Sequence, residues 1–420
     1  MNILVIGSGG REHALCHSIV KSASCDNLFI APGNAGTAGL GSNVALNPMD
    51  FVGVTDFVGQ ESIGLVVVGP EAPLDAGLAD HLRAAGIPVV GPGKAGAILE
   101  SSKAWSKAFM QRHGIPTAAS RTFSEGDLAD AVAYVQQHPL PVVVKASGLA
   151  AGKGVLICET SAEAEAGVRD MLSGSSFGDA GATIVVEAFL SGIECSVFIL
   201  TDGESWVTLP NAKDYKRIGE GDTGLNTGGM GAVSPVPFAD DDFMALVNDQ
   251  IVVPTVQGLK MERIPFQGFI FFGLIAVQGA PYVIEYNVRM GDPETEVVFP
   301  RITSDVVDLL AGAANGALEG YEIGVMPEAC TTVMLVSGGY PGTYAKGLEI
   351  SGLDAVEDAT VFHAGSKLVN DRLETNGGRV LAITAFGSDI KAALEKSLRG
   401  AEAVEFSGKY FRRDIGQDLL

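Results

Sequence analysis

The first hundred residues of the chain alternate short apolar runs with segments of helical periodicity. The runs NILVIG, NLFIA, GLVVVG and PVVG are separated by patterns such as REHALCHSIVKS and LDAGLADHLRAAG. This alternation is typical of a parallel α/β sheet, because parallel neighbours must be joined by a crossover segment. Ligands bind such sheets at the carboxyl ends of the strands. GSGGREH, APGNAG and VGPEAPL all fall at strand ends, so we expect a binding face there.

The remaining residues divide into three further units. Residues 122–187 form a compact insert of strands and helices around a glycine-rich loop, and they interrupt a strand-rich central unit of residues 101–121 and 188–326. A last unit, residues 327–420, contains two strands and an amphipathic helix. With residues 1–100, these units predict a multidomain protein of the α/β and α+β classes: an N-terminal parallel α/β domain, a split central domain with its insert, and a C-terminal α+β domain.

The charge balance of the chain is strongly acidic. Fifty Asp and Glu residues against 28 Lys and Arg residues give a formal net charge of −22. Nucleic-acid backbones are bound by clustered Lys and Arg, so we expect no nucleic-acid partner. An anionic ligand must instead be held by local basic side chains and backbone N–H groups.

Cysteine usage and hydropathy place the chain in a reducing, aqueous compartment. Five cysteines are scattered without a CxxC pair, which predicts neither a disulfide framework nor a zinc site. The chain opens on an apolar strand-like run without a basic leader. Its longest apolar stretch, residues 268–277, is too short to cross a bilayer. We therefore expect a cytoplasmic protein without a membrane partner.

The turn Gly7-Ser8-Gly9-Gly10 lies between a strand and a helix, as in dinucleotide-binding proteins. The third glycine of G-x-G-x-x-G would be residue 12, which is Glu12, and the strand NLFIA ends without the acidic residue that binds a ribose. These departures argue against a nicotinamide cofactor. A helix N-terminus flanked by glycines still suits a phosphate, and the alternative is a tight structural turn.

The segment VVVKASGLAAGKGV combines a lysine at a strand end with a glycine-rich loop. Lys145 supplies a fixed charge, and Gly148, Gly152, Lys153 and Gly154 form a backbone that can fold over phosphates. The loop is not a P-loop, because no Ser or Thr follows Lys153. A hairpin loop with two surface lysines is the structural alternative.

Two later segments have weaker signals for ligand binding. Residues 187–190, EAFL, leave a strand, where exposed backbone groups suit an adenine edge, and the Glu194 carboxylate suits ribose hydroxyls. In KDYKRIGEGDTGLNTGGMGA, Lys216 and Arg217 can clamp an anion, while the turn beginning at Asn226 can present successive N–H groups. A flexible surface loop is the alternative for this second segment.

The densest charge pattern is IEYNVRMGDPETE, residues 284–296. Strand alternation puts Glu285, Asn287 and Arg289 on one face and Ile284, Tyr286 and Val288 on the other. Carboxylate and amide oxygens are hard ligands that suit Mg²⁺, and an adjacent arginine can stabilise a phosphoryl group in transfer. The alternative is an edge strand with a solvated face, in which Arg289 is a structural ion-pair partner.

Together these segments resemble the phosphoribosylamine–glycine ligase family, also called glycinamide ribonucleotide synthetases, of the ATP-grasp superfamily. The resemblance runs nearly end to end through GSGGREHAL, PGNAG, VGPEAPL, SSKAWSKAFMQRHGIPT, KASGLAAGKGV, DYKR, NTGGMGA and RMGDPETE. It implies that ATP phosphorylates glycine to glycyl phosphate. The amine of 5-phosphoribosylamine then attacks this intermediate to give glycinamide ribonucleotide, ADP and phosphate. It also implies that residues 122–187 are the lid of an ATP-grasp domain.

The resemblance assigns roles residue by residue. The implied catalytic residues are Arg289, Asp292 and Asp214. The implied ATP contacts are Lys103, Lys145, Gly148, Gly152, Lys153, Gly154, Glu187, Ala188, Leu190 and Glu194. The implied contacts to glycine and 5-phosphoribosylamine are Gly9, Gly10, Glu71, Lys216, Arg217 and Asn226. The implied ligands of Mg²⁺, or of Mn²⁺, are Glu285 and Asn287.

The chain departs from the family pattern at a few positions, and some questions stay open. Lys213 stands where Gln is common, Leu225 stands where Pro is common, and GFIFFGLI lacks the earlier glutamate that many ATP-grasp relatives use as a metal ligand. The number of metal ions, the roles of Glu294 and Glu296, and the oligomeric state therefore stay open, with a monomer as the working expectation. The alternative functions are another ATP-grasp ligase or carboxylase, and a nucleotide sensor without turnover.

Overall fold

The N-terminal residues form the predicted parallel sheet. The structure is a computed structural model that describes residues 1–150, 154–174 and 178–420. The strand order is β3 (Ser42–Asn43), β2 (Asn27–Pro32), β1 (Asn2–Gly7), β4 (Ile63–Val68) and β5 (Val89–Val90). The helices around it are α1 (Gly10–Ile19), α2 (Phe51–Gln60), α3 (Glu71–Ala76), α4 (Leu78–Ala84) and α5 (Lys94–Ser101). β1 is central because it pairs in parallel with both β2 and β4.

The second sheet is antiparallel and forms the middle of the molecule. Its order is β11 (Trp206–Thr208), β10 (Ile193–Thr201), β16 (Gly268–Val277) and β17 (Ala280–Asn287). β16 and β17 form a tight hairpin in which Gln278 and Gly279 have φ angles of +51° and +83°, as a two-residue turn requires. The accompanying helices are α6 (Lys103–Arg112), α9 (Asp241–Val247), α10 (Val253–Met261), α11 (Thr295–Val298) and α12 (Val306–Asn315).

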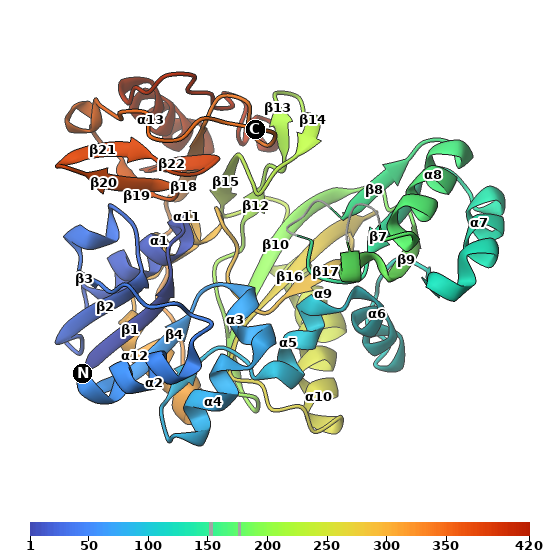
Figure 1. Cartoon of the computed structure of the whole chain (residues 1–420), viewed down its shortest axis with the longest axis horizontal. Helices are drawn as coiled ribbons and strands as arrows, with labels where there is room; N and C mark the ends of the chain where they lie inside the picture. The colour runs from blue at the N-terminus through green and yellow to red at the C-terminus, as the bar shows by residue number, and fades with distance from the viewer. Residues whose placement is uncertain (151–153, 175–177) are drawn as a thin grey trace.

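The predicted insert is a separate lobe that projects from the body on the right of Figure 1. Its antiparallel sheet has the order β6 (Ser120–Ser124), β9 (Thr183–Ala188), β7 (Val142–Ala146) and β8 (Val155–Cys158). Its helices are α7 (Leu128–Gln137) and α8 (Ser161–Leu172), and the lobe has its own apolar core. A capping box begins α8, because the Glu163 N–H donates to Thr160 Oγ1 at 3.2 Å.

The C-terminal sheet combines strands from two distant parts of the chain. Its order is β12 (Lys213–Asp214), β15 (Gly231–Ser234), β18 (Ala329–Val336), β22 (Arg379–Gly387) and β19 (Thr360–His363). Two hairpins, β13 (Arg217–Gly219) with β14 (Thr223–Asn226) and β20 (Ser366–Val369) with β21 (Arg372–Thr375), accompany helix α13 (Ile390–Ala403). Because β12 and β15 belong to this sheet, residues 213–234 connect the C-terminal domain to the middle sheet.

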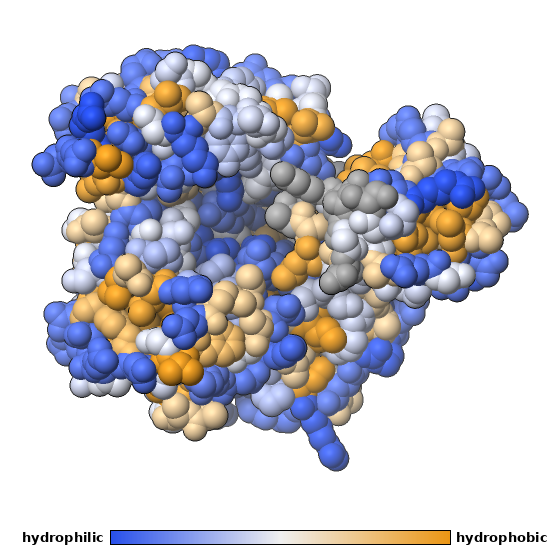
Figure 2. Space-filling model, viewed as in Figure 1, coloured by the Kyte–Doolittle hydropathy of each residue, from blue (hydrophilic) through white to orange (hydrophobic). Residues whose placement is uncertain are grey.

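The surface has a central hollow between these parts. Figure 2 shows the hollow between the body and the projecting lobe, with hydrophilic residues inside it. Among the described residues, no helix combines the length and the apolar character that a membrane crossing requires.

Helix α1 joins the N-terminal sheet to the C-terminal sheet through a cluster of histidines. The His363 backbone N–H donates to His13 Nδ1 at 2.8 Å, and the His13 ring lies edge-on to Phe362 with 5.5 Å between the ring centroids. Burial, with His363 and His17 nearby, lowers the pKa of His13 to about 3. Burial lowers the pKa of His363 to about 4. Both imidazole rings are therefore uncharged at neutral pH, and each can accept or donate a hydrogen bond.

This contact predicts acid sensitivity. Below pH 6.5 the unfolded histidines gain protons that the folded ones do not, so stability falls as pH drops from 6.5 towards the folded pKa values, by up to ~1.4 kcal/mol per pH unit for each histidine. We expect His13→Gln to flatten the dependence of the thermal unfolding midpoint on pH between 6.5 and 4. The exposed His81, changed to Gln, is the control and should leave that dependence unchanged. An unchanged slope in the His13 variant would contradict this account.

Candidate active site

The end of strand β17 brings the predicted metal ligands to the hollow. Tyr286 and Val288 lie in the apolar core, as alternation predicts. The predicted placement of Ile284 on that face is wrong, because a register shift between Gly273 and Leu274 of the partner strand leaves Ile284 unpaired and puts Val283 in the core. This β-bulge bends the strand before its last residues, a device that often re-aims side chains at active sites.

Glu285 is an ionised carboxylate surrounded by cations. Burial raises its pKa, but nearby positive charges outweigh burial and lower the pKa below its ordinary value. These positive charges belong to Lys216, Lys145, Lys103 and Arg289. Among the residues that the structure describes, none of them forms an ion pair or hydrogen bond with Glu285. The carboxylate, with the buried Asn287 amide two residues later, is free to bind another group.

A second carboxylate, Glu187, binds two of the lysines of the site. Glu187 Oε2 lies 2.8 Å from Lys145 Nζ, and Glu187 Oε1 lies 3.1 Å from Lys107 Nζ. All three side chains are buried. Lys103 Nζ donates only a long bond, of 3.4 Å, to the Gly148 carbonyl. Lys107 was not among the predicted site residues, and its helical spacing from Lys103 is the one signal in the sequence that marks it.

The glycine-rich loop is described only at its two ends. Gly152 and Lys153 lie outside the described residues. Gly148 donates its N–H to the Ala180 carbonyl at 3.1 Å, and the Gly154 carbonyl accepts from the Ala146 N–H at 2.8 Å. A side chain at Gly148 would collide with the Ala180 backbone, so glycine is required there.

At the hinge after β9, one backbone N–H group is already hydrogen-bonded, whereas apolar side chains that an adenine could contact are exposed. The Ala188 N–H already donates to the Ala119 carbonyl at 2.9 Å, so that group is occupied. Leu190 is half-buried, and exposed apolar side chains lie next to the hinge at Phe189 and Ile193. An apolar surface of this kind suits a flat ring, and the roles of Ala188 and Leu190 stay predictions.

Arg289 binds two carboxylates from different parts of the chain. Its guanidinium lies 3.1 Å from Glu71 Oε2 and 2.9 Å from Glu100 Oε1. Glu100 also accepts the Val288 N–H at 2.8 Å. Arg289 and Glu71 are therefore ion-pair partners in the structure. A structural ion pair is the alternative role that the sequence left open for Arg289. A further contact of either residue with a ligand stays a prediction.

Asp214, Lys216 and Glu194 meet on the other side of Glu285. Lys216 Nζ lies 3.2 Å from Glu194 Oε2. Burial, opposed by Lys216 and assisted by Glu194, raises the pKa of Asp214. Arg217 and Asn226 are instead paired across the β13–β14 hairpin, where the Arg217 guanidinium donates to the Gly224 carbonyl at 2.8 Å. Asp214, Lys216 and Glu194 thus lie together, whereas Arg217 and Asn226 lie on the hairpin.

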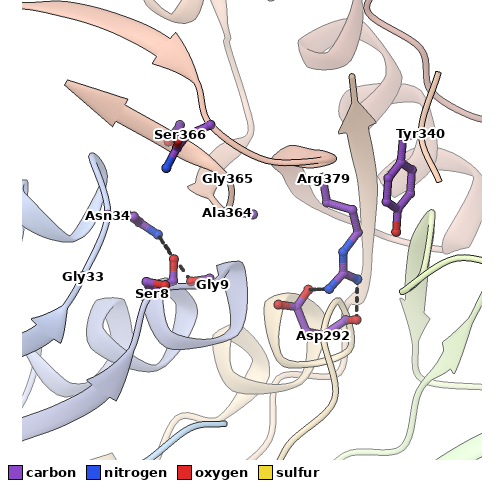
Figure 3. A pocket seen from close by; sticks show the side chains of 11 residues that line it. Ser8, Gly9, Gly33, Asn34, Asp292, Tyr340, Ala364, Gly365, Ser366 and Arg379 are labelled. Atoms are coloured by element: carbon purple, nitrogen blue, oxygen red, sulfur yellow. Dashed lines mark hydrogen bonds and ion pairs between the residues drawn. The ribbon is translucent and has the colours of Figure 1, made fainter. Parts of the chain in front are cut away.

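A cavity of about 350 Å³ lies between the glycine turn before α1 and the C-terminal sheet. Figure 3 shows its lining residues: Ser8, Gly9, Gly33, Asn34, Asp292, Tyr340, Ala364, Gly365, Ser366, Asn376 and Arg379. Gly9 and Asp292 were predicted, whereas the C-terminal residues were missed because nothing in their spacing marks them. Gly10 does not line the cavity and packs against Glu296.

Two charged contacts shape this cavity. Arg379 lies 3.0 Å from Asp292 Oδ1 and donates to the Asp292 carbonyl at 2.6 Å, as the dashed lines in Figure 3 show. Glu12, the residue that breaks the dinucleotide motif, reaches back and accepts the Gly9 N–H at 2.6 Å. Its side chain occupies the space beside Gly7 and Gly69, so those glycines leave room for the cap.

Glu294 and Glu296, left open by the sequence, are buried acids. Burial, with Asp214 nearby, raises the pKa of Glu294 to about 7, and Ser196 Oγ donates to it at 3.0 Å. Burial, with Asp292 nearby, raises the pKa of Glu296 well above its ordinary value. Both Glu296 oxygens lack a hydrogen-bond partner among the described residues. Burial without a hydrogen-bond partner therefore favours the protonated, uncharged form of Glu296.

The structure predicts that the charge of Glu296 is dispensable. Its folded pKa is raised, so ionisation of the unfolded chain lowers stability as pH rises above about 4.5. We expect Glu296→Gln to remove this loss, giving a higher thermal unfolding midpoint than the parent at pH 8 and a smaller difference at pH 5. The exposed Glu402, changed to Gln, should not show this trend. A Glu296→Gln variant that is less stable at pH 8 would mean that the carboxylate is ionised and partnered.

The arrangement of the sheets resembles that of solved structures of other proteins. A biotin carboxylase from Campylobacter jejuni, solved as a β-γ-ATP complex, has a TM-score of 0.72 at 13% identity, over 99% of this chain and 94% of that chain. At this identity the likeness concerns the fold alone. The N-terminal parallel sheet, the central domain with its inserted lobe and the C-terminal domain confirm the fold class that the sequence predicted.

The family follows from the sequence of each part. Residues 1–100, 101–295 and 330–418 match the N domain, the ATP-grasp (A) domain and the C domain of phosphoribosylglycinamide synthetase. Hence the chain belongs to the phosphoribosylglycinamide synthetase family.

Similar full-length proteins agree with this assignment. The phosphoribosylamine–glycine ligase of Chlorobaculum tepidum is 45% identical over 427 residues, covering 100% of both chains. That of Vibrio cholerae is 46% identical, covering 99% of this chain and 98% of its own. The crystal structure of the Thermotoga maritima enzyme has a TM-score of 0.86 at 32% identity, covering 99% of this chain and 100% of its own.

Proposed function

We propose that the chain is a ligase that joins glycine to 5-phosphoribosylamine at the expense of ATP, a step of purine biosynthesis. The products are glycinamide ribonucleotide, ADP and phosphate. The full-length relatives described above support this activity. The observation that carries it is the ionised, unpartnered Glu285 beside Asn287, within the cluster of lysines at the end of β17.

The end of β17 fits a divalent metal. The Glu285 carboxylate and the Asn287 amide are hard oxygen donors, and Mg²⁺ takes its remaining ligands from phosphates and water. Among the described residues, no group of three or more His, Cys, Asp or Glu side chains is arranged as a metal site. We propose Glu285 and Asn287 as the protein ligands. When bound, Mg²⁺ or Mn²⁺ neutralises phosphate charge and polarises the phosphoryl group in transfer.

The phosphates of ATP are bound, in this proposal, by lysines with free donors. An ammonium group has three N–H donors. Lys103 uses one of them for the Gly148 carbonyl, and Lys145 uses two, for Glu187 and for the Ile284 carbonyl at 3.3 Å. The remaining donors, with the backbone around Gly154, are available to phosphate oxygens. The hinge at Ala188 and Leu190, with Glu194, contacts the adenosine.

The reaction follows in two steps. A glycine carboxylate oxygen takes the γ-phosphoryl group, with ADP leaving, and gives glycyl phosphate. The amine of 5-phosphoribosylamine then attacks the acyl carbon, and phosphate leaves. The lobe that carries Lys145 stands against β17 and excludes the water that would hydrolyse the acyl phosphate. Asp214, whose pKa burial raises, is suited to accept the proton that the amine loses.

We propose the cavity beside α1 as the site of the 5-phosphoribosylamine phosphate. It combines the glycine turn at Gly9 with the Arg379 guanidinium, and a helix N-terminus and an arginine are both favourable for phosphate. Asp292 holds Arg379 in place and lies at the boundary with the nucleotide side. The domain division at residues 1–100, 101–121 with 188–326, 122–187 and 327–420 is part of this proposal.

The activity is tested by ADP release with Mg-ATP, glycine and 5-phosphoribosylamine generated in the assay. Omission of either glycine or the amine should remove turnover, and glycinamide ribonucleotide should appear in step with ADP. Turnover that ignores glycine, or that continues with bicarbonate in its place, would support a different ATP-grasp enzyme.

The metal site predicts the outcome of one isosteric change. Glu285→Gln removes the carboxylate charge and keeps its size, so we expect turnover to fall by at least about 100-fold while the fold is retained. Circular dichroism and the thermal unfolding midpoint check the fold. Glu125→Gln, an exposed residue of the lobe, is the control that should keep full activity. A Glu285 variant with near-parental turnover would remove Glu285 from the metal site.

The phosphate cavity predicts a selective effect on one substrate. In Arg379→Met, the KM for 5-phosphoribosylamine should rise about tenfold or more, because a charge-assisted contact is lost. The KM for ATP should stay within about twofold, because the lysines of the nucleotide side are untouched. Equal increases in both KM values would show that Arg379 supports the fold of the whole cleft instead.

A further inference from the structure

Lys107 differs from the other lysines of the cleft in the number of its contacts with the protein. Its Nζ donates hydrogen bonds to Thr117 Oγ1 at 2.6 Å and to the Ala118 carbonyl at 3.3 Å. It also forms an ion pair with Glu187 Oε1 at 3.1 Å, an oxygen that accepts no hydrogen bond among the described residues. Lys107 is therefore committed to the protein and cannot bind a phosphate without breaking a contact.

The position of Lys107 connects three parts of the chain. Lys107 lies on α6 in the body, Glu187 lies at the end of β9 where the chain leaves the lobe, and Lys145 lies on β7 inside the lobe (Figure 1). Thr117, which accepts from Lys107, donates in turn to the Val283 carbonyl of β17 at 2.7 Å. The contacts of Lys107 thus fix the base of the lobe against the strand that carries Glu285.

The charges of this triad explain why two lysines share one carboxylate. With Lys145 alone, the Glu187 pair would be neutral, and the lysine would offer little net charge to a phosphate. With Lys107 included, two positive side chains face one negative side chain. Burial lowers the pKa of Lys107 to about 8, with Glu187 opposing this shift, so Lys107 is still protonated at neutral pH.

We propose that Lys107 is a positioning residue for the nucleotide: through Glu187 it holds Lys145 in place and leaves the triad of Lys107, Glu187 and Lys145 with one net positive charge toward the phosphates. The inference rests on the proposed function in so far as the anion is the triphosphate of ATP. Lys107 acts through Glu187 and Lys145 and does not touch the reacting atoms.

The test compares variants of Lys107 by steady-state kinetics and by calorimetric binding of Mg-ATP. Lys107→Met should raise the KM and the dissociation constant for ATP about tenfold, because the triad loses a unit of positive charge. The KM for glycine should stay within about twofold of the parent value. Lys107→Arg keeps the charge and should recover most of the ATP affinity.

A matched control separates this effect from a general loss of buried contacts. Lys409 is also almost buried and is committed to the protein, donating to the Ala401, Glu402 and Val404 carbonyls in the C-terminal domain. Lys409→Met should lower the thermal unfolding midpoint and leave ATP affinity unchanged. Equal ATP affinity in the parent, Lys107→Met and Lys409→Met proteins would overturn the proposal.

A double variant tests the charge balance directly. Lys107→Met combined with Glu187→Gln removes one charge of each sign, so the net charge near Lys145 is restored and ATP affinity should return to within about threefold of the parent value. An affinity as poor as that of Lys107→Met, or poorer, would overturn the charge account. If Lys107→Met alone does not fold, Lys107→Gln, which also removes the charge, takes its place in both comparisons.

Failure of this inference is distinguishable from failure of the proposed function. If the parent protein binds Mg-ATP but shows no turnover that depends on glycine and 5-phosphoribosylamine, the proposed function fails. The Mg-ATP affinities of the variants still decide the role of Lys107 in that case.

Discussion

The buried ion pairs of Arg289 are the constraint on which the site depends. One guanidinium holds Glu71 of the N-terminal domain and Glu100 of α5, while Glu100 also accepts the backbone of the strand extension at Val288. A buried charge must be partnered, and removal of one partner leaves the others unpaired at a cost of several kcal/mol. The network therefore fixes where β17 ends relative to the N-terminal sheet, and with it the positions of Glu285 and Asn287.

The same end of β17 has several positive side chains around Glu285, which can attract a polyanion. Lysines and an arginine lower the pKa of Glu285, although none of them binds it directly among the described residues. The carboxylates of Glu187 and Glu194 form ion pairs with Lys145 and Lys216 and hold these lysines in place. On the other side, the glycine turn and Arg379 line the cavity that we propose for a second anion, and Asp292 pairs with Arg379 there. In this proposal, two anionic substrates bind at separate places around one strand end.

The sequence predicted the fold more completely than it predicted the side-chain contacts. Local patterns were sufficient for the parallel sheet, because periodicity depends on near neighbours. The bulge at Ile284 was missed because it depends on pairing with β16. Lys107 and Arg379 were missed for a related reason: their partners Glu187 and Asp292 are 80 or more positions away in the chain. Carboxylates given ligand roles by resemblance, such as Glu71 and Glu194, have protein partners that only the folded chain reveals.

The central claim is that the cleft activates the glycine carboxylate by phosphorylation, and transfer of oxygen from glycine to phosphate tests it most directly. Turnover with glycine labelled with ¹⁸O in both carboxylate oxygens should release phosphate that contains one ¹⁸O atom for each glycinamide ribonucleotide formed. The label reaches phosphate because the glycine oxygen that accepts the phosphoryl group stays bonded to phosphorus when phosphate leaves. Phosphate without ¹⁸O, in an assay that forms the product at the same rate, would contradict the account.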